Sequence, residues 1–317
     1  MNIIIDTDPG GDDAIALMWL ASLCHQQRIT LGAVTTAAGN VGADKTWRNA
    51  HGLLKLCAIE GAAVAIGDEV EQTRNAAEIH GEDGLGGLAE ALPPAPSCPS
   101  RPHAAALLRE RLAGAVNLLA VAPLTNLAQA EASAPGILSK ADGIIIMGGA
   151  LEAGNVTPAA EFNFYFDPAA AARTLKAANE ARLVTLETSS ALRLDDVRTR
   201  EITRGLEVTP AAHFFRNLCA FMARRDAIFS GRSSPGFPVH DAATVAWLAY
   251  PELFEARELG LTVDVEMGAA RGRLRQSDSA DASMCQVATR VDADGLLDIM
   301  GRDLRVLFEL LHAETPD

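Results

Sequence analysis

The sequence is poor in cysteine and in basic residues, and both shortages narrow the possible functions. Its five cysteines, Cys24, Cys57, Cys98, Cys219 and Cys285, are scattered and form no CxxC pair. We therefore expect reduced thiols in a cytoplasmic protein, without structural zinc. Lys and Arg number 27 against 41 Asp and Glu, a formal charge of −14. A protein that binds a nucleic acid polymer would need a basic face, so that class is disfavoured.

Long apolar runs are also missing. No stretch of eighteen uncharged apolar residues occurs, so we expect no membrane span. An apolar run begins at residue 3 and predicts a strand immediately, which leaves no room for a signal peptide.

What the sequence does contain is an alternation of strand and helix patterns. Runs typical of strands occupy residues 3–5, 29–36, 63–66, 116–121 and 144–147, and helical spacing covers 14–20, 41–56 and 104–112. Alternation of this kind predicts a mostly parallel sheet with helices on both faces. Residues 67–101 form a long Gly- and Pro-rich connection, which is usually functional or flexible. No domain boundary is evident, so residues 1–317 are expected to form a single domain.

Polar residues follow these predicted strands at their carboxyl ends, where open α/β sheets bind ligands. The first strand leads into Asp6, Asp8, Asp12 and Asp13, with a Pro-Gly-Gly turn between the two pairs. The glycines allow a sharp turn, and the second pair falls at the start of a helix, where negative charge is favoured. Asn40, Val121 and Gly148 occupy the ends of later strands.

Four carboxylates this close repel one another, and a bound hard cation such as Ca²⁺ or Mg²⁺ would resolve the conflict. The alternative is a capped helix with surface acids. An EF-hand loop is excluded because it needs a further ligand where Gly10 stands, and a helix rather than a strand before it. A phosphatase of the haloacid-dehalogenase type also begins strand-DxD, and that alternative stays open.

Two later stretches carry chemistry. Asn155, Glu161 and Asn163 lie within nine residues among phenylalanines, and buried amides and a carboxylate suit recognition of sugar hydroxyls. A polar loop with Asn in turns is the alternative. His240 and Asp241 precede an apolar helical run, where Asp241 could equally be a helix cap.

These stretches resemble the inosine–uridine nucleoside hydrolase family. The string DTDPGGDDAIAL at residues 6–17 is similar to the family's N-terminal signature, and the spacing N-x₅-E-x-N at 155–163 matches its ribose-binding stretch. The histidine of IHGEDGL, His80, resembles a second family histidine near the base, although a solvated loop histidine is the alternative. The resemblance implies a nucleoside hydrolase fold: a single α/β domain with a Rossmann-like core.

The resemblance also implies an enzyme that hydrolyses the N-glycosidic bond of purine or pyrimidine ribonucleosides, giving ribose and free base. A bound Ca²⁺ is implied, and homodimers or homotetramers are usual for the family. The nucleoside is the expected small-molecule partner. The implied metal ligands are Asp8, Asp13, the Val121 carbonyl and Asp241. The resemblance also makes Asp8 the general base and His240 the acid, with Asp6 orienting its neighbours. For the substrate, it implies that Asp12 and Asn163 hold ring hydroxyls, Asn155 and Glu161 hold the 5′-hydroxyl, Asn40 orients the loop or the ribose, and His80 lies near the base.

Two features depart from the family pattern. Ala122 replaces the glycine of a GPLTN-type turn, which is tolerated only if its φ is negative. The segment directly before His240, FMARRDAIFSGRSSPGFPV, often carries a tyrosine near the base in relatives, but here it has none. Phe229, Arg224, Arg225 or Arg232 could take its place. Base preference is therefore open, as are two other functions: a Mg²⁺-dependent phosphatase and a non-catalytic, calcium-stabilised nucleoside-binding protein.

Overall fold

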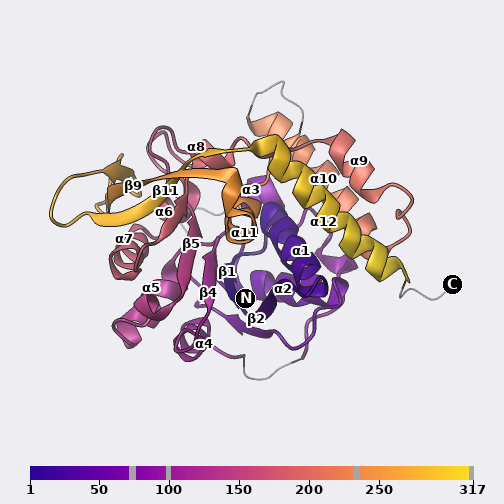
Figure 1. Cartoon of the computed structure of the whole chain (residues 1–317), viewed down its shortest axis with the longest axis horizontal. Helices are drawn as coiled ribbons and strands as arrows, with labels where there is room; N and C mark the ends of the chain where they lie inside the picture. Colours follow the sequence, from indigo (N-terminus) through magenta and orange to yellow (C-terminus); the bar gives the residue numbers. More distant parts are fainter. Residues whose placement is uncertain (71–75, 98–100, 231–235, 314–317) are drawn as a thin grey trace.

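A computed structural model describes residues 1–70, 76–97, 101–230 and 236–313 of the chain (Figure 1). The described residues form a nine-stranded sheet and a two-stranded one. From edge to edge, the large sheet consists of β10 (Leu274–Gln276), β9 (Phe254–Val263), β11 (Ser283–Val291), β6 (Arg182–Val184), β5 (Gly143–Met147), β4 (Asn117–Ala120), β1 (Asn2–Thr7), β2 (Thr30–Thr36) and β3 (Ala63–Ile66). The small sheet pairs β7 (Arg193–Leu194) with β8 (Phe237–Pro238).

The predicted mostly parallel sheet is confirmed. All neighbours from β3 to β11 are parallel, and the antiparallel pairs are β11 with β9 and β9 with β10, at one edge. The order 3-2-1-4-5-6 in its centre means that the chain reverses direction across the sheet between β1 and β4. A crevice opens where strand order reverses in this way, outside the carboxyl ends of the two strands. Asp8 follows β1 and Val121 follows β4, so both lie at this point.

Helices cover both faces of the sheet, as predicted (Figure 1). The side chains of β1 divide between the faces: Ile3 and Ile5 pack into one buried cluster and Ile4 into the other, as the two-residue period of a strand requires. The first cluster includes side chains of α1 (Gly11–His25), α2 (Ala43–Leu56), α9 (Asp196–Thr203), α10 (Pro210–Phe229), α11 (Ala242–Ala249) and α12 (Ala293–Ala313). The second includes those of α4 (Ala104–Arg111), α5 (Thr125–Ser133) and α7 (Pro168–Ala177).

Helix α1 is buried from Gly11 to Leu23. Its sequence is apolar on all sides, which is typical of a helix enclosed by others, and it packs against α2, α10, α11 and α12. Because α1 is enclosed, its first turn and the two aspartates there are fixed at the end of the sheet.

The connection over residues 67–101 differs from the predicted loop. Its described part contains α3 (Ala77–His80) and the 3-10 turn η1 (Ala89–Ala91), and α3 packs against α10. Two further short helices, α6 (Phe162–Phe166) and α8 (Leu186–Ser189), follow β5 and β6.

No helix in the described ranges is long and apolar enough to cross a membrane. Cys24, Cys57, Cys219 and Cys285 are free thiols, and Cys98 lies outside the described residues.

Candidate active site

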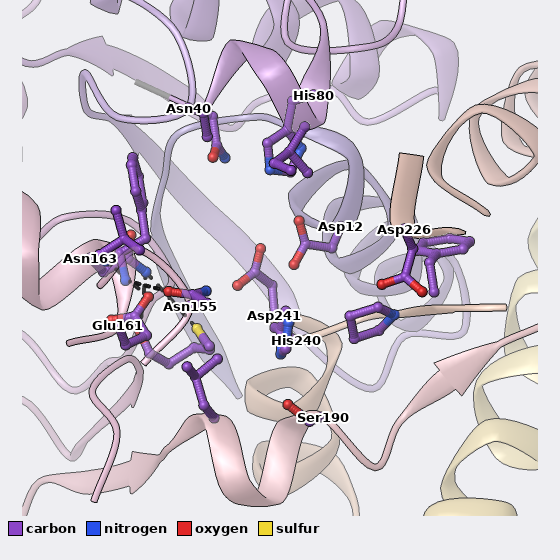
Figure 2. Close-up of a pocket in the computed structure, with 18 of the residues that line it drawn as sticks. Asp12, Asn40, His80, Asn155, Glu161, Asn163, Ser190, Asp226, His240 and Asp241 are labelled. Atoms are coloured by element: carbon purple, nitrogen blue, oxygen red, sulfur yellow. Dashed lines mark hydrogen bonds between the residues drawn. The ribbon is translucent and has the colours of Figure 1, made fainter. Parts of the chain in front are cut away.

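A cavity of about 730 Å³ lies at the carboxyl ends of the central strands. Figure 2 shows its labelled side chains converging from segments far apart in the sequence. Every metal-binding, catalytic or substrate-binding residue expected from the sequence lines it: Asp8, Asp12, Asp13, Asn40, His80, Val121, Asn155, Glu161, Asn163, His240 and Asp241.

Asp13 is held in place by hydrogen bonds to both of its oxygens. Its Oδ1 accepts the hydroxyl of Thr7 at 2.6 Å, and its Oδ2 accepts the Gly10 N–H at 3.0 Å and the Asn40 amide at 2.9 Å. The turn between β1 and α1 therefore closes around this carboxylate, which leaves Asp13 little freedom to move.

Asp8 is oriented by the loop after β2. Its Oδ2 accepts the backbone N–H of Asn40 at 2.6 Å, and the Asn40 side chain donates to the Asp8 carbonyl at 3.1 Å. A Cβ on Gly39 would lie 2.0 Å from the same Oδ2, so a side chain at position 39 would displace the carboxylate. Asn40 thus fixes both Asp8 and Asp13.

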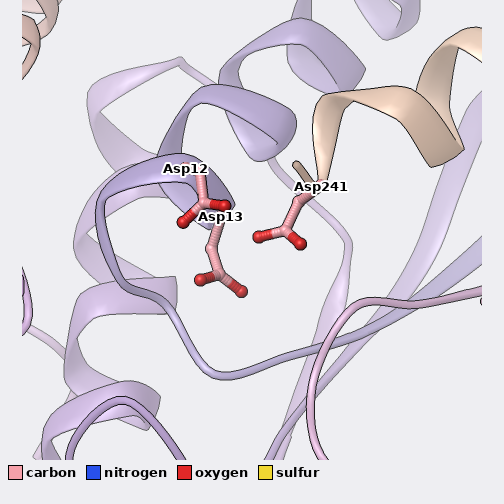
Figure 3. Close-up of side chains that lie close together, drawn as sticks. All are labelled: Asp12, Asp13 and Asp241. Atoms are coloured by element: carbon pink, nitrogen blue, oxygen red, sulfur yellow. The ribbon is translucent and has the colours of Figure 1, made fainter. Parts of the chain in front are cut away.

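Asp241 completes a group of three carboxylates with Asp12 and Asp13 (Figure 3). One oxygen from each lies within 4.8 Å of the others. Asp241 occupies the N-cap position of α11, but its side chain makes no capping hydrogen bond. The capping alternative is therefore wrong for its carboxylate, which points toward the other two.

The pKa values of the aspartates are raised, as expected for buried carboxylates whose negative charges are not compensated by a nearby positive charge. Burial and then the negative charge of Asp13 raise the pKa of Asp12 to about 7. Burial raises the pKa of Asp8 and of Asp241 well above the usual range, with Asp13 and Asp12 as the next causes. Among the described residues that line the cavity, the one Lys or Arg is Arg193. This donor set of carboxylate oxygens fits a hard cation such as Ca²⁺ or Mg²⁺.

Asp6 lies behind this group and is not part of the cavity wall. Its Oδ1 accepts the hydroxyl of Thr35 at 2.5 Å and the amide of Asn126 at 2.8 Å. Burial raises its pKa to about 7. Because Asn126 lies in the first turn of α5, which follows β4, Asp6 ties the start of that helix to β1 and β2.

The stretch after β5 is organised by Glu161, in a way that the sequence did not indicate. Its carboxylate accepts the backbone N–H groups of Asn163, Phe164 and Gly149 at 2.8–3.1 Å and so caps helix α6. Burial raises its pKa, while these hydrogen bonds lower it. Glu161 therefore fixes the backbone of the sugar-recognition stretch.

The side chains of Asn163 and Asn155 also make hydrogen bonds within the protein. The amide nitrogen of Asn163 donates to the carbonyls of Val121 at 3.0 Å and Met147 at 3.3 Å. Asn155 is exposed at the rim, and its Oδ1 accepts the Phe162 N–H at 2.9 Å. Among the described residues, no hydrogen bond engages the oxygen of Asn163 or the NH₂ of Asn155, so both are available to a ligand.

His80 is buried at the end of α3, so the solvated-loop alternative is wrong. Its Nδ1 accepts the backbone N–H of Gly11 at 2.9 Å. That N–H is one of the donors left without a partner at the start of a helix, so His80 completes the N-terminus of α1. Burial, and then the charge of His240, lower the pKa of His80 to about 4.

His240 is held by Ser189, a residue that the sequence analysis missed. Ser189 Oγ lies 2.8 Å from Nδ1 of His240 and donates to the carbonyl of Thr185 at 3.0 Å. A hydroxyl has one proton to give, so when Ser189 donates to Thr185, Nδ1 of His240 is the donor toward Ser189. Burial, and then the nearby Arg193, lower the pKa of His240 to about 4.

The two departures from the family pattern now have structural answers. Ala122 is not among the described residues with positive φ, so alanine is tolerated there. Phe229 lines the cavity, whereas Arg224 and Arg225 do not, and Arg232 lies outside the described residues. Asp226 and Arg193 also line it. No local motif distinguishes Arg193, so no sequence signal could have found it.

Comparisons with known proteins agree over nearly the whole chain. Residues 3–298 match the family described as inosine-uridine preferring nucleoside hydrolase. A pyrimidine-specific ribonucleoside hydrolase RihA of Shewanella baltica is 34% identical, with 96% of each chain covered. The structure of a purine-preferring ribonucleoside hydrolase from Gardnerella vaginalis superposes with a TM-score of 0.88 at 26% identity, covering 98% of this chain and 100% of the other. A plant nucleoside hydrolase, PpNRh1, gives a TM-score of 0.87 at 26% identity, covering 96% and 98%.

Proposed function

The chain belongs to the inosine-uridine preferring nucleoside hydrolase family and is an N-glycosidase that hydrolyses ribonucleosides; on this basis we propose a calcium-dependent reaction in the cavity between β1 and β4. The phosphatase and the non-catalytic binding protein are set aside by this membership. The relatives include both a pyrimidine-specific and a purine-preferring enzyme, so they leave the base preference open.

The observation that carries the proposal is the meeting of Asp12, Asp13 and Asp241 beside Asp8. We propose that Asp8, Asp13, Asp241 and the Val121 carbonyl hold Ca²⁺, with Asp12 at the edge of the same site. When bound, this ion would lower the pKa of a coordinated water and orient the ribose hydroxyls. The raised pKa values of Asp8, Asp12 and Asp241 support a cation here, because a positive charge would relieve the repulsion that contributes to them.

Asp8 is the proposed general base. Cleavage of an N-glycosidic bond develops positive charge on the ribose, and a water must lose a proton as it attacks the anomeric carbon. One oxygen of Asp8 is held by the Asn40 N–H, which leaves the other for the water.

The ribose is proposed to bind between the aspartates and the stretch from Asn155 to Asn163. Asp12 and the Asn163 oxygen suit the ring hydroxyls. Asn155 and Glu161 suit the 5′-hydroxyl, with the Asn155 NH₂ as the donor. The capping bonds of Glu161 support this arrangement because they fix the recognition stretch before substrate binds.

His240 is proposed to act on the leaving base through Nε2, because Nδ1 is engaged by Ser189. As an acid it must carry a proton on both nitrogens. Negative charge that develops on the departing base favours this protonated form, against the effect of burial. His80 is proposed to shape the base side of the cavity.

Self-association and a cytoplasmic location remain predictions. Exposed apolar side chains on and beside the antiparallel edge of the sheet, Val265, Met267 and Met284, support a homodimer or homotetramer. Light scattering of the purified protein tests this, and a monomeric mass at micromolar concentration would refute it.

Product analysis tests the function. The protein is incubated with inosine, uridine, cytidine and adenosine, and free base and ribose are quantified. We expect release of both products by the wild type and none by Asp8→Asn, which keeps the size of the side chain but removes the base and one anionic ligand. Full activity of the wild type after complete removal of divalent ions would overturn the calcium mechanism.

A further inference from the structure

A buried carboxyl group in α12 lies outside the cavity and has no role in the chemistry above. Asp303 is 2% exposed, and its Oδ2 accepts the indole N–H of Trp19 at 3.0 Å and the hydroxyl of Tyr250 at 2.5 Å. Nη1 of Arg28 lies 3.8 Å from the same oxygen, and the Asp303 carbonyl accepts the hydroxyl of Ser22. Asp303 therefore binds side chains from several other parts of the chain.

Stability alone is a poor explanation for an aspartate at this position. Burying a carboxyl group costs free energy that its hydrogen bonds only offset, whereas an apolar side chain of similar size would pack without that cost. The neighbours of Asp303 in α12 that face the core, Leu304, Leu307 and Phe308, are apolar. What the carboxyl group adds is direction, because a hydrogen bond holds its partners at a defined distance and angle.

The two helices that Asp303 joins both begin at the candidate metal site. Trp19 lies in α1, six residues after Asp13, and Tyr250 is the C-cap residue of α11, nine residues after Asp241. At 1.5 Å per residue, these separations are about 9 Å and about 14 Å of helix. The Trp19 and Tyr250 rings also stack, with their centroids 6.1 Å apart. One oxygen of Asp303 thus links α1 and α11 behind the carboxylates that they carry.

The position of Asp241 depends on this packing more than that of Asp13 does. Asp13 is bound by Thr7, Gly10 and Asn40, but among the described residues no hydrogen bond holds the Asp241 side chain. Its distance from Asp13 is therefore set by how α11 packs against α1, which also packs against α12 (Figure 1). Calcium needs its oxygen ligands at about 2.3–2.6 Å, so a small shift of α11 would move one ligand out of reach.

We propose that Asp303 is a positioning residue for the metal site, which keeps α11 in place against α1 by binding Trp19 and Tyr250 on one oxygen; this inference rests on the proposed calcium site. Ligands that are already in place bind an ion without the cost of moving the helices together. Loss of the link should therefore weaken calcium binding, although Asp303 does not touch the ion.

The experiment titrates chelator-treated protein with Ca²⁺ in a calorimeter, without substrate. Trp19→Phe and Tyr250→Phe each remove one donor to Asp303. Each should lower the calcium affinity about 2- to 10-fold, as for loss of one buried hydrogen bond. The double variant should lose little more than either single one, because one broken bond already separates the two helices.

Substitutions of Asp303 itself separate the acceptor from the shape of the side chain. Asp303→Asn keeps an oxygen that can accept both donors, so its calcium affinity should stay near that of the wild type. Asp303→Leu has a similar size and no acceptor, and should lose as much affinity as the double variant.

Leu108→Ala is the control for stability. Leu108 is fully buried in α4, in the cluster on the other face of the sheet, and its truncation leaves a cavity that should lower the melting temperature. Its calcium affinity should be unchanged, because the titration measures binding to the folded protein. Circular dichroism and thermal melting confirm that each variant is folded at the temperature of the titration.

Wild-type affinity in folded Trp19→Phe and Tyr250→Phe variants would overturn the proposal. An equal loss of affinity in Leu108→Ala, or losses that add up in the double variant, would also count against it. Failure of the wild type to bind Ca²⁺ would instead contradict the proposed calcium site.

Discussion

Ser189 and His240, 51 residues apart in the chain, are joined by a hydrogen bond of 2.8 Å between Oγ and Nδ1. Ser189 belongs to α8 after β6, and His240 lies just before Asp241, the N-cap residue of α11. When the Ser189 hydroxyl donates to Thr185, this contact engages Nδ1 of His240 as a donor and leaves Nε2 as the ring nitrogen for a ligand. The role proposed for His240 therefore depends on a residue outside the reacting groups.

Ser189→Ala should lower kcat for nucleosides by about 10-fold with little change in KM, since a buried hydrogen bond is worth roughly 1 kcal/mol. The reason is that Nδ1 of His240 loses its acceptor and Nε2 is no longer fixed toward the base. p-Nitrophenyl riboside, whose leaving group needs no proton, should be hydrolysed nearly as fast as by the wild type. Steady-state kinetics with inosine and this substrate measure the difference.

Ser133→Ala is the matched control, because the Ser133 hydroxyl also donates to a helical carbonyl, that of Ala130, but far from the cavity. If Ser189→Ala or His240→Ala slows both substrates equally, His240 is an orienting residue rather than the acid.

Calcium affinity should rise with pH. The raised pKa values mean that, without metal, Asp12 is half protonated near pH 7 and that Asp8 and Asp241 also retain protons above their usual range. These protons must leave before a cation binds, so binding releases protons and affinity increases about tenfold per pH unit for each proton released. Calorimetric titration of chelator-treated protein with Ca²⁺ below and above pH 7 measures this. An affinity that does not change with pH would show that the aspartates are ionised before the metal binds.

His80→Asn should change the pH dependence of stability. Burial lowers the pKa of His80 from 6.5 to about 4, so between these values the unfolded chain binds a proton that the folded chain does not. The wild type therefore loses stability as pH falls from 6.5 to about 4, by at most about 3 kcal/mol from this group.

The asparagine side chain in this variant would keep an oxygen acceptor for the Gly11 N–H and would not titrate. Denaturant unfolding at several pH values should show the wild type losing more stability in acid than the variant. Parallel curves for the two proteins would mean that His80 is accessible to protons in the folded state.

Asn155→Ala and Asn155→Asp should both lose discrimination for the 5′-hydroxyl. The aspartate variant keeps the acceptor for the Phe162 N–H but lacks the NH₂ donor, so it separates loop structure from substrate contact. We expect kcat/KM for uridine to fall about 10-fold while that for 5′-deoxyuridine is unchanged. A preference for the 5′-hydroxyl that survives in both variants would remove Asn155 from this role.

The parts of the molecule that depend on local patterns could be predicted from the sequence. The apolar run before Asp6, the turn at Gly10 and the all-round apolar helix after Asp13 specify β1, the tight turn and a buried α1, because each rests on steric and burial preferences of neighbouring residues. Alternation of such units was enough for a parallel sheet covered on both faces. It was also enough to place Asp8, Asn40 and Val121 at the carboxyl ends of neighbouring strands of that sheet.

The orientation and burial of side chains that meet from distant segments could be read only from the folded chain. The sequence allowed Asp241 to cap its helix and His80 to lie in solvent. In the structure, the packing of α11 directs Asp241 toward Asp12, and the packing of α3 places His80 against Gly11. The Arg193–Asp226 pair had no local signature, because it arises where β7 and α10 meet. Contacts of this kind depend on the order of strands and the packing of helices between them, which short-range periodicity does not encode.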